Sequence, residues 1–88
     1  MREITISGAE IGTREALHDV LQEKLALPDW YGRNLDALYD CLTAELTEET
    51  QLTVTDTEML EEALGSYGRV FLRVLEEAAE ENPRLHIQ

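Results

Sequence analysis

The sequence contains little of what a disulfide, a secretion signal or a membrane span requires. Its 88 residues include one cysteine, Cys41, so an intramolecular disulfide is impossible and a reducing compartment is favoured. The start, MREITISG, has no apolar run of signal-peptide length. No segment approaches the roughly 20 apolar residues of a membrane-spanning helix. We therefore expect a cytoplasmic protein that does not enter a membrane.

Residues that could perform catalysis or hold a cofactor are also scarce. No glycine-rich phosphate-binding loop is present. The two histidines, His18 and His86, lie far apart and have no partner at metal-binding spacing, so His18 is expected to be a surface or half-buried residue. Cys41 follows Asp40, and an acidic neighbourhood raises the pKa of a thiol, which favours a buried small hydrophobe over a nucleophile. We expect no enzymatic activity, no cofactor and no metal.

Positive charge is the third shortage. There are 7 basic residues against 19 acidic ones, giving a formal net charge of -12. A field of this sign repels nucleic acid and anionic membranes and attracts basic partners. Direct binding of RNA or DNA requires a basic footprint, which this sequence lacks. A basic protein is therefore the expected partner, although a merely soluble acidic protein would carry the same charge.

The length and the apolar pattern predict one α/β domain over residues 1–88, with 43% of residues hydrophobic. Apolar and β-branched runs predict short strands at 3–6, 51–55 and 84–87. Each connection between these strands is long and helical, which parallel strands require. The expected fold is a small three-stranded parallel sheet packed by about four helices.

Local signals predict where those helices begin and end. Thr13 is a plausible N-cap of the first helix, and Pro28 is expected to stop it. Thr55 and Glu58 have the spacing of a capping box, which predicts the start of a short third helix. A longer helix is expected from about Tyr67 to Glu81. Its predicted core stripe is formed by Val70, Phe71, Val74, Leu75 and Ala78.

The stretch from Leu27 to Leu46, LPDWYGRNLDALYDCLTAEL, is the most informative part of the chain. Asn34 is a good N-cap for a helix that runs to about Glu45. Advancing about 100° per residue places the leucines at 35, 38, 42 and 46 on one stripe, which is the core face. A different stripe is formed by Asp36, Asp40 and Thr43, with Tyr39 at its border.

Asp36 and Asp40 are four residues apart and repel each other, which costs an isolated helix about 0.2–0.5 kcal/mol. A solvated acidic face is the simplest explanation of such a pair. The preceding loop favours a binding surface, because Trp30 and Tyr31 lie there, and aromatic residues are typical of binding hot spots. A catalytic carboxylate pair is disfavoured, since an exposed helix face offers no pocket.

The same stretch resembles the barstar family, intracellular inhibitors of a secreted ribonuclease. The matching segments are LALPDWYGRNLDALYDCLT in the middle and ISGAEI near the start. The resemblance covers the first half of the chain well and the second half by the order of elements. It implies a barstar-like fold and an inhibitor that plugs a ribonuclease active site. The acidic groups of the helix would then take the place of RNA phosphates.

The resemblance also implies roles for individual residues. Asp40 would be the main phosphate mimic, Asp36 would support it, and Thr43 would make a polar contact. Glu77 matches a more distant acidic contact. The full implied partner-binding set is Trp30, Gly32, Asn34, Asp36, Tyr39, Asp40, Thr43 and Glu77. The implied partner is a basic secreted or toxin ribonuclease, bound one to one by a protein that is a monomer when free.

Three positions depart from the family pattern. Arg33 places positive charge beside the acidic face, which leaves the partner's identity open and suits a ribonuclease with an acidic rim. Tyr39 replaces a tryptophan, and Asn82 replaces a cysteine with little expected effect.

Other functions stay open. An immunity protein against another toxin, or an acidic interaction module, would suit the same face. An acidic carrier protein is disfavoured, because no serine stands at the start of the helix after Asn34.

Overall fold

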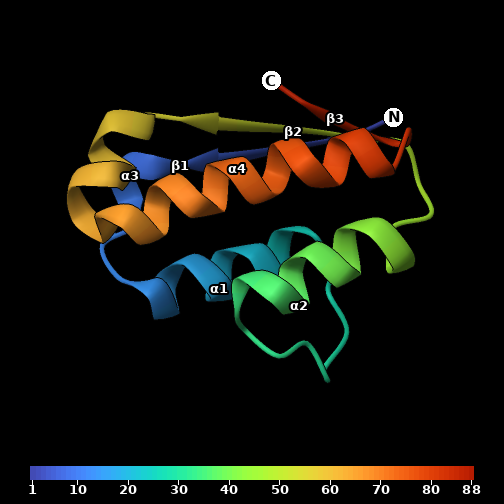
Figure 1. The fold of residues 1–88 in the computed structure, drawn as a ribbon, viewed down its shortest axis with the longest axis horizontal. Coiled ribbons are helices and arrows are strands. Elements are labelled where there is room, and N and C mark those ends of the chain that lie inside the picture. The colour runs from blue at the N-terminus through green and yellow to red at the C-terminus, as the bar shows by residue number, and fades with distance from the viewer.

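The computed structural model describes residues 1–88 and contains a three-stranded parallel sheet with helices packed below it (Figure 1). The strands lie in the order β1 (Arg2–Ser7), β2 (Thr50–Thr55) and β3 (Leu85–Ile87). Both pairs are parallel, and Leu52 of the central strand stands opposite Ile4 on one side and Ile87 on the other. The predicted α/β fold and the parallel sheet are confirmed.

The helices cover one side of the sheet and close one of its ends. In chain order they are α1 (Arg14–Lys24), α2 (Leu35–Asp40), α3 (Thr57–Leu64) and α4 (Ser66–Glu81). A π-helical turn, Cys41–Glu45, continues α2, and a short 3-10 turn, Gly8–Glu10, follows β1. Figure 1 shows α1, α2 and α4 running alongside one another, with α3 at one end of the sheet. None of the helices has the length and apolarity needed to cross a membrane.

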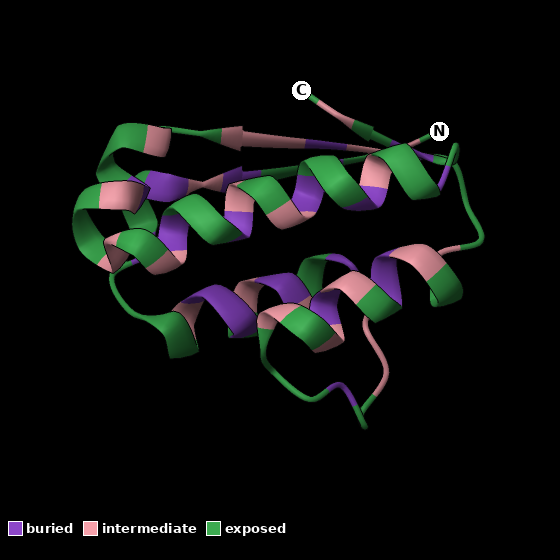
Figure 2. Cartoon of the chain, viewed as in Figure 1, coloured by how far each residue is buried: buried purple, intermediate pink, exposed green.

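The core lies between the sheet and the inward faces of α1, α2 and α4, as the buried positions in Figure 2 show. Leu38 and Leu42 of the predicted leucine stripe are fully buried, while the leucines at 35 and 46 are half-buried at its ends. On α4 the stripe is narrower than predicted. Val70 is 38% exposed, because it lies about 100° around the helix from the buried centre of the stripe at Phe71.

Two predicted helix signals are wrong in detail. α1 ends at Lys24, well before Pro28, and Ala26 has a left-handed φ of 52° that prevents continuation. The capping box at Thr55 does not form, because Thr55 is still paired with Ser7 in the sheet. The cap position is Asp56, with a φ of 51° and no side-chain capping bond.

Asn82 holds the end of the α2 segment to the end of α4. Its side chain is buried, its Nδ2 donates to the carbonyl oxygen of Leu42 at 2.8 Å, and its Oδ1 accepts from the amide of Arg84 at 3.0 Å. Carbonyls at the end of a helix lack intrahelical donors, so Asn82 satisfies one of them in the interior. The sequence predicts little effect from having Asn82 in place of a cysteine. These hydrogen bonds instead give the Asn82 side chain a structural role.

Candidate partner-binding site

An acidic hollow lies between α2 and α4. It has a volume of about 350 Å³ and is lined by Leu35, Asp36, Tyr39, Asp40, Val74 and Glu77. α4 packs against α2, which brings Glu77 to the hollow although it is distant from Asp36 and Asp40 in sequence. The guanidinium of Arg33 pairs with Asp19, and His86 forms a hydrogen bond with Glu49. The carboxylates of the hollow are therefore not neutralised by a cation of their own chain.

Tyr39 is the half-buried phenol of this hollow. Burial raises its pKa first, and the negative charges of Glu81, Glu77 and Asp40 raise it further. The hydroxyl consequently stays protonated at neutral pH and can donate a hydrogen bond. The hollow thus offers several carboxylate acceptors and one phenol donor.

The start of α2 is fixed by Asn34, as predicted. Its Oδ1 accepts from the amide of Ala37 at 2.7 Å, and its Nδ2 donates to the carbonyl oxygen of Gly32 at 3.3 Å. A β-carbon on Gly32 would lie 3.2 Å from that of Ala37, closer than most real contacts of this kind. Asn34 and Gly32 therefore hold the loop tightly against the first turn of α2.

Thr43 points its hydroxyl hydrogen back into the helix. Oγ1 donates to the carbonyl oxygen of Tyr39 at 2.8 Å, within the segment that contains the π-helical turn. The hydroxyl oxygen remains as an acceptor, and the side chain is half-buried. Thr43 can therefore accept a hydrogen bond from a partner more readily than it can donate one.

Trp30 is the displayed aromatic residue of the loop, with 68% of its surface exposed. It lines a second hollow of about 370 Å³, whose other walls include Leu27, Pro28, Leu42 and Glu45. Tyr31, which the sequence placed beside it as a second displayed aromatic, is only 4% exposed and belongs to the core. The loop presents one large aromatic residue, and the two hollows share no lining residue.

His18 is buried, and its predicted surface or half-buried position is wrong. Its Nδ1 lies 2.6 Å from the hydroxyl of Tyr31, and its Nε2 lies 2.7 Å from the hydroxyl of Tyr67 on α4. Burial and then the positive charge of Arg33 lower the pKa of His18, while Asp19 opposes them. His18 thereby connects the loop to α1 and α4 in its neutral form.

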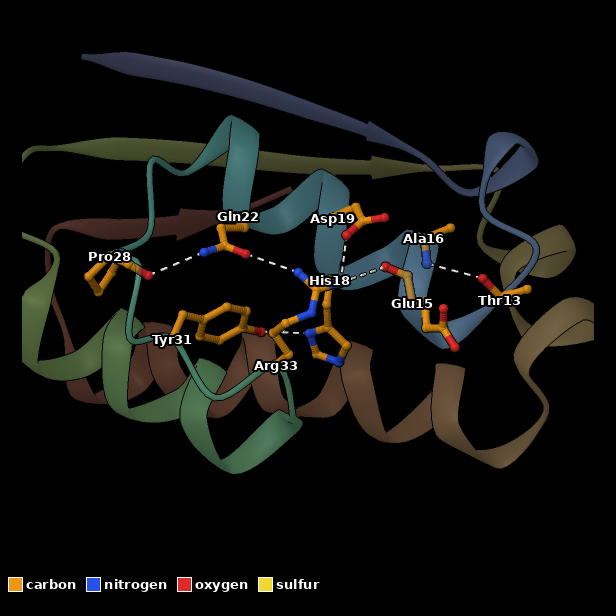
Figure 3. A network of polar contacts seen from close by, with 9 residues as sticks. All are labelled: Thr13, Glu15, Ala16, His18, Asp19, Gln22, Pro28, Tyr31 and Arg33. Carbon is orange, nitrogen blue, oxygen red and sulfur yellow. Dashed lines mark hydrogen bonds and ion pairs between the residues drawn. The ribbon is translucent and has the colours of Figure 1, made fainter.

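Arg33 is directed to α1, as Figure 3 shows. Its guanidinium donates to Asp19 Oδ1 at 2.5 Å, to Gln22 Oε1 at 2.9 Å and to the carbonyl oxygen of Glu15 at 3.2 Å. The expectation that Arg33 places its positive charge beside the acidic face is therefore corrected, because the guanidinium is turned toward α1. Its charge is paired with Asp19 on another helix.

Cys41 is buried, as predicted, and burial followed by the charges of Glu45 and Asp40 raises its thiol pKa. A protonated, enclosed thiol is a poor nucleophile. Nowhere does the structure gather three or more His, Cys, Asp or Glu side chains in an arrangement that could hold a metal ion. The chemistry displayed at the surface is that of charge and aromatic contact.

A small α/β chain with exposed carboxylates on one helix and an exposed tryptophan before it displays side chains that are typical of protein-binding surfaces. The family model described as "Barstar (barnase inhibitor)" matches residues 1–87, and the chain belongs to this family of inhibitors. It is 47% identical, over 81 residues, to the Bacillus subtilis (strain 168) protein described as "Putative ribonuclease inhibitor YrdF". The match covers 92% of this chain and 89% of that relative.

Proposed function

We propose that this protein inhibits a basic ribonuclease by covering its active site in an equimolar complex. The observation that carries the proposal is the acidic hollow, where Asp36, Asp40 and Glu77 converge without a cation of their own. A ribonuclease binds RNA phosphates with cationic side chains. Carboxylates at fixed positions on two helices can occupy the same cationic groups and exclude RNA.

Trp30 would supply a separate apolar contact from the loop that precedes α2. An exposed tryptophan buries a large area when a partner covers it, and such residues dominate the affinity of many interfaces. The net charge of -12 would steer a basic partner toward the complex before contact. On this proposal the protein acts as a non-catalytic monomer in the cytoplasm, where Cys41 stays reduced.

The proposal is tested by titrating a small basic microbial ribonuclease with the protein and following RNA cleavage. Wild type should abolish cleavage at a molar ratio near one. A variant carrying Asp36→Asn, Asp40→Asn and Glu77→Gln should lose at least about a hundredfold in affinity, because truncating desolvated charge pairs costs about 2–5 kcal/mol each.

A matched control separates the hollow from net charge. Glu10, Glu58 and Glu62 are exposed on the 3-10 turn and on α3, and their conversion to glutamine changes the net charge equally. This control should inhibit almost as well as wild type at physiological salt. Equal losses in both variants would assign the effect to overall charge. Inhibition of a deoxyribonuclease in place of every basic ribonuclease tried would favour an immunity protein of another specificity.

A further inference from the structure

The loop that carries Trp30 is attached to one face of α1 at both ends and in the middle (Figure 3). At the first end, Gln22 Nε2 donates to the carbonyl oxygen of Pro28 at 3.3 Å. In the middle, His18 binds the hydroxyl of Tyr31. At the far end, Arg33 donates to Gln22 Oε1 at 2.9 Å. One glutamine amide therefore contacts both ends of the loop.

Arg33 makes most of the side-chain contacts at the far end. Besides Gln22 it reaches Asp19 and the carbonyl oxygen of Glu15, so a single guanidinium spans three residues of α1. Its backbone has a φ of 54°, in the left-handed region that residues with a β-carbon rarely adopt. A non-glycine residue stays in that region when surrounding contacts fix it, and these contacts to α1 do so.

Trp30 has no such attachments. It is 68% exposed, and no side-chain hydrogen bond fixes its indole. Its position is set by its neighbours, since the amide of Tyr31 donates to the carbonyl oxygen of Pro28 at 2.9 Å and both residues are held by α1. A tryptophan on an ordered loop loses less conformational freedom on binding than one on a mobile loop.

We propose that Arg33, together with Gln22, is a positioning residue that holds the loop of residues 28–33 on α1 so that Trp30 is presented to the partner in its binding position. This role rests on the proposed inhibition of a ribonuclease. It differs from a direct contact between Arg33 and an acidic rim of the partner, because the guanidinium is already occupied by Asp19 and Gln22.

The test measures affinity for a basic ribonuclease and amide hydrogen exchange in the free protein. Arg33→Ala should weaken binding by about tenfold, the cost of ordering a few side chains on association. It should also raise the exchange rate of the Tyr31 amide in the free state. Arg33→Lys should behave like Arg33→Ala, because an ammonium cannot reproduce the forked contacts. Arg69→Ala, which removes an equal charge from the exposed side of α4, should resemble wild type in both measurements.

Two further variants test whether the effect comes from the loss of the Arg33 charge or from a direct contact of Arg33 with the partner. Gln22→Ala removes the contact with Pro28 and one of the three contacts of Arg33 without changing the charge, and it should reproduce both effects in part. In a Trp30→Ala background, Arg33→Ala should change affinity by less than about twofold, since there is no longer an indole to position.

Several results would overturn the positioning role. Wild-type affinity in Arg33→Lys would assign the effect to charge, and a full effect of Arg33→Ala in the Trp30→Ala background would mean that Arg33 touches the partner itself. Unchanged exchange of the Tyr31 amide would mean that the contacts do not order the loop. If wild type binds a ribonuclease and the Arg33 variants bind equally well, the positioning role is contradicted and the proposed function is not. If wild type binds no ribonuclease, both the proposed function and the positioning role are wrong.

Discussion

The acidic hollow and the loop that carries Trp30 are built in opposite ways. In the hollow, Asp36, Asp40 and Glu77 lie on two regular helices and remain unpaired. In the loop, the polar groups of Arg33 and Tyr31 are bound to α1, and only one aromatic side chain projects. The helices satisfy their own backbone polar groups and can leave carboxylates unpaired, whereas the irregular loop binds its polar groups to α1.

Asp40→Ala tests the hollow and should change affinity more than the other substitutions. Affinity for a confirmed ribonuclease partner should fall by about 2–5 kcal/mol, because cationic groups of the partner would stay buried and unpaired. The free energy of unfolding should stay level or rise by a few tenths of a kcal/mol, since repulsion from Asp36 is removed. Denaturant melts and binding titrations of Asp40→Ala and Asp36→Ala check both. A stability loss above about 1 kcal/mol would contradict the exposed, unpaired character of Asp40.

The salt dependence of the association rate distinguishes the charged hollow from the aromatic loop. If the hollow meets a basic partner, the association rate should fall about tenfold or more from low to high salt, because the screening length shortens to about 3 Å at 1 M. Stopped-flow measurements with wild type and Trp30→Ala should give parallel salt dependences. A flat dependence in wild type would mean that the carboxylates do not face the partner.

Tyr31→Phe tests the interior of the loop. It removes the hydroxyl that pairs with buried His18 Nδ1 at 2.6 Å. Leaving a buried polar atom without a partner costs about 1–3 kcal/mol of stability. Chemical denaturation should show this loss, with Tyr67→Phe as a comparison at the other ring nitrogen. Wild-type stability in both variants would contradict a structural role for the two hydroxyls.

Trp30→Ala tests the exterior of the same loop. Binding should weaken by more than about 1 kcal/mol, as expected for an aromatic hot spot. The free energy of unfolding should change by less than about 0.5 kcal/mol, as is usual for surface substitutions. Isothermal titration and thermal melts measure the two quantities. Unfolding of this variant would show that Trp30 packs in the core.

The smallest effect is a pH dependence of stability due to His18. Its pKa is lowered from the ordinary value of 6.5 by burial and by Arg33, against the opposing charge of Asp19. The unfolded chain therefore binds a proton more readily than the folded chain, and stability is full above pH 6.5 and declines as the pH falls through the folded pKa. Melts between pH 8 and 5 should show a steeper decline for wild type than for His18→Gln, as expected from the ordinary histidine range. Identical slopes would remove His18 as the cause.

The sequence predicts the acidic hollow better than it predicts the contacts of the loop. The hollow follows from local periodicity, which placed Asp36 and Asp40 away from the buried leucines, and family resemblance added Glu77. The interior of the loop depends on Tyr67, which is 49 residues from His18, and no local pattern indicates that pairing. The same holds for Asn82, whose carbonyl partner Leu42 is 40 residues away. Long-range polar pairs such as these escape periodicity, because their geometry depends on how the helices pack.

The order of assembly during synthesis follows from the central position of β2. β1 cannot pair until β2 has been made, and their paired residues Arg2 and Thr50 are separated by the whole α1–α2 region. Such non-local contacts form slowly, and nascent chains emerge N-terminal end first. Trp30, Asp36 and Asp40 therefore leave the ribosome before Tyr67 and Glu77, which complete their surroundings. A chain interrupted before α4 would carry Asp36 and Asp40 without the helix that supplies the other wall of the hollow.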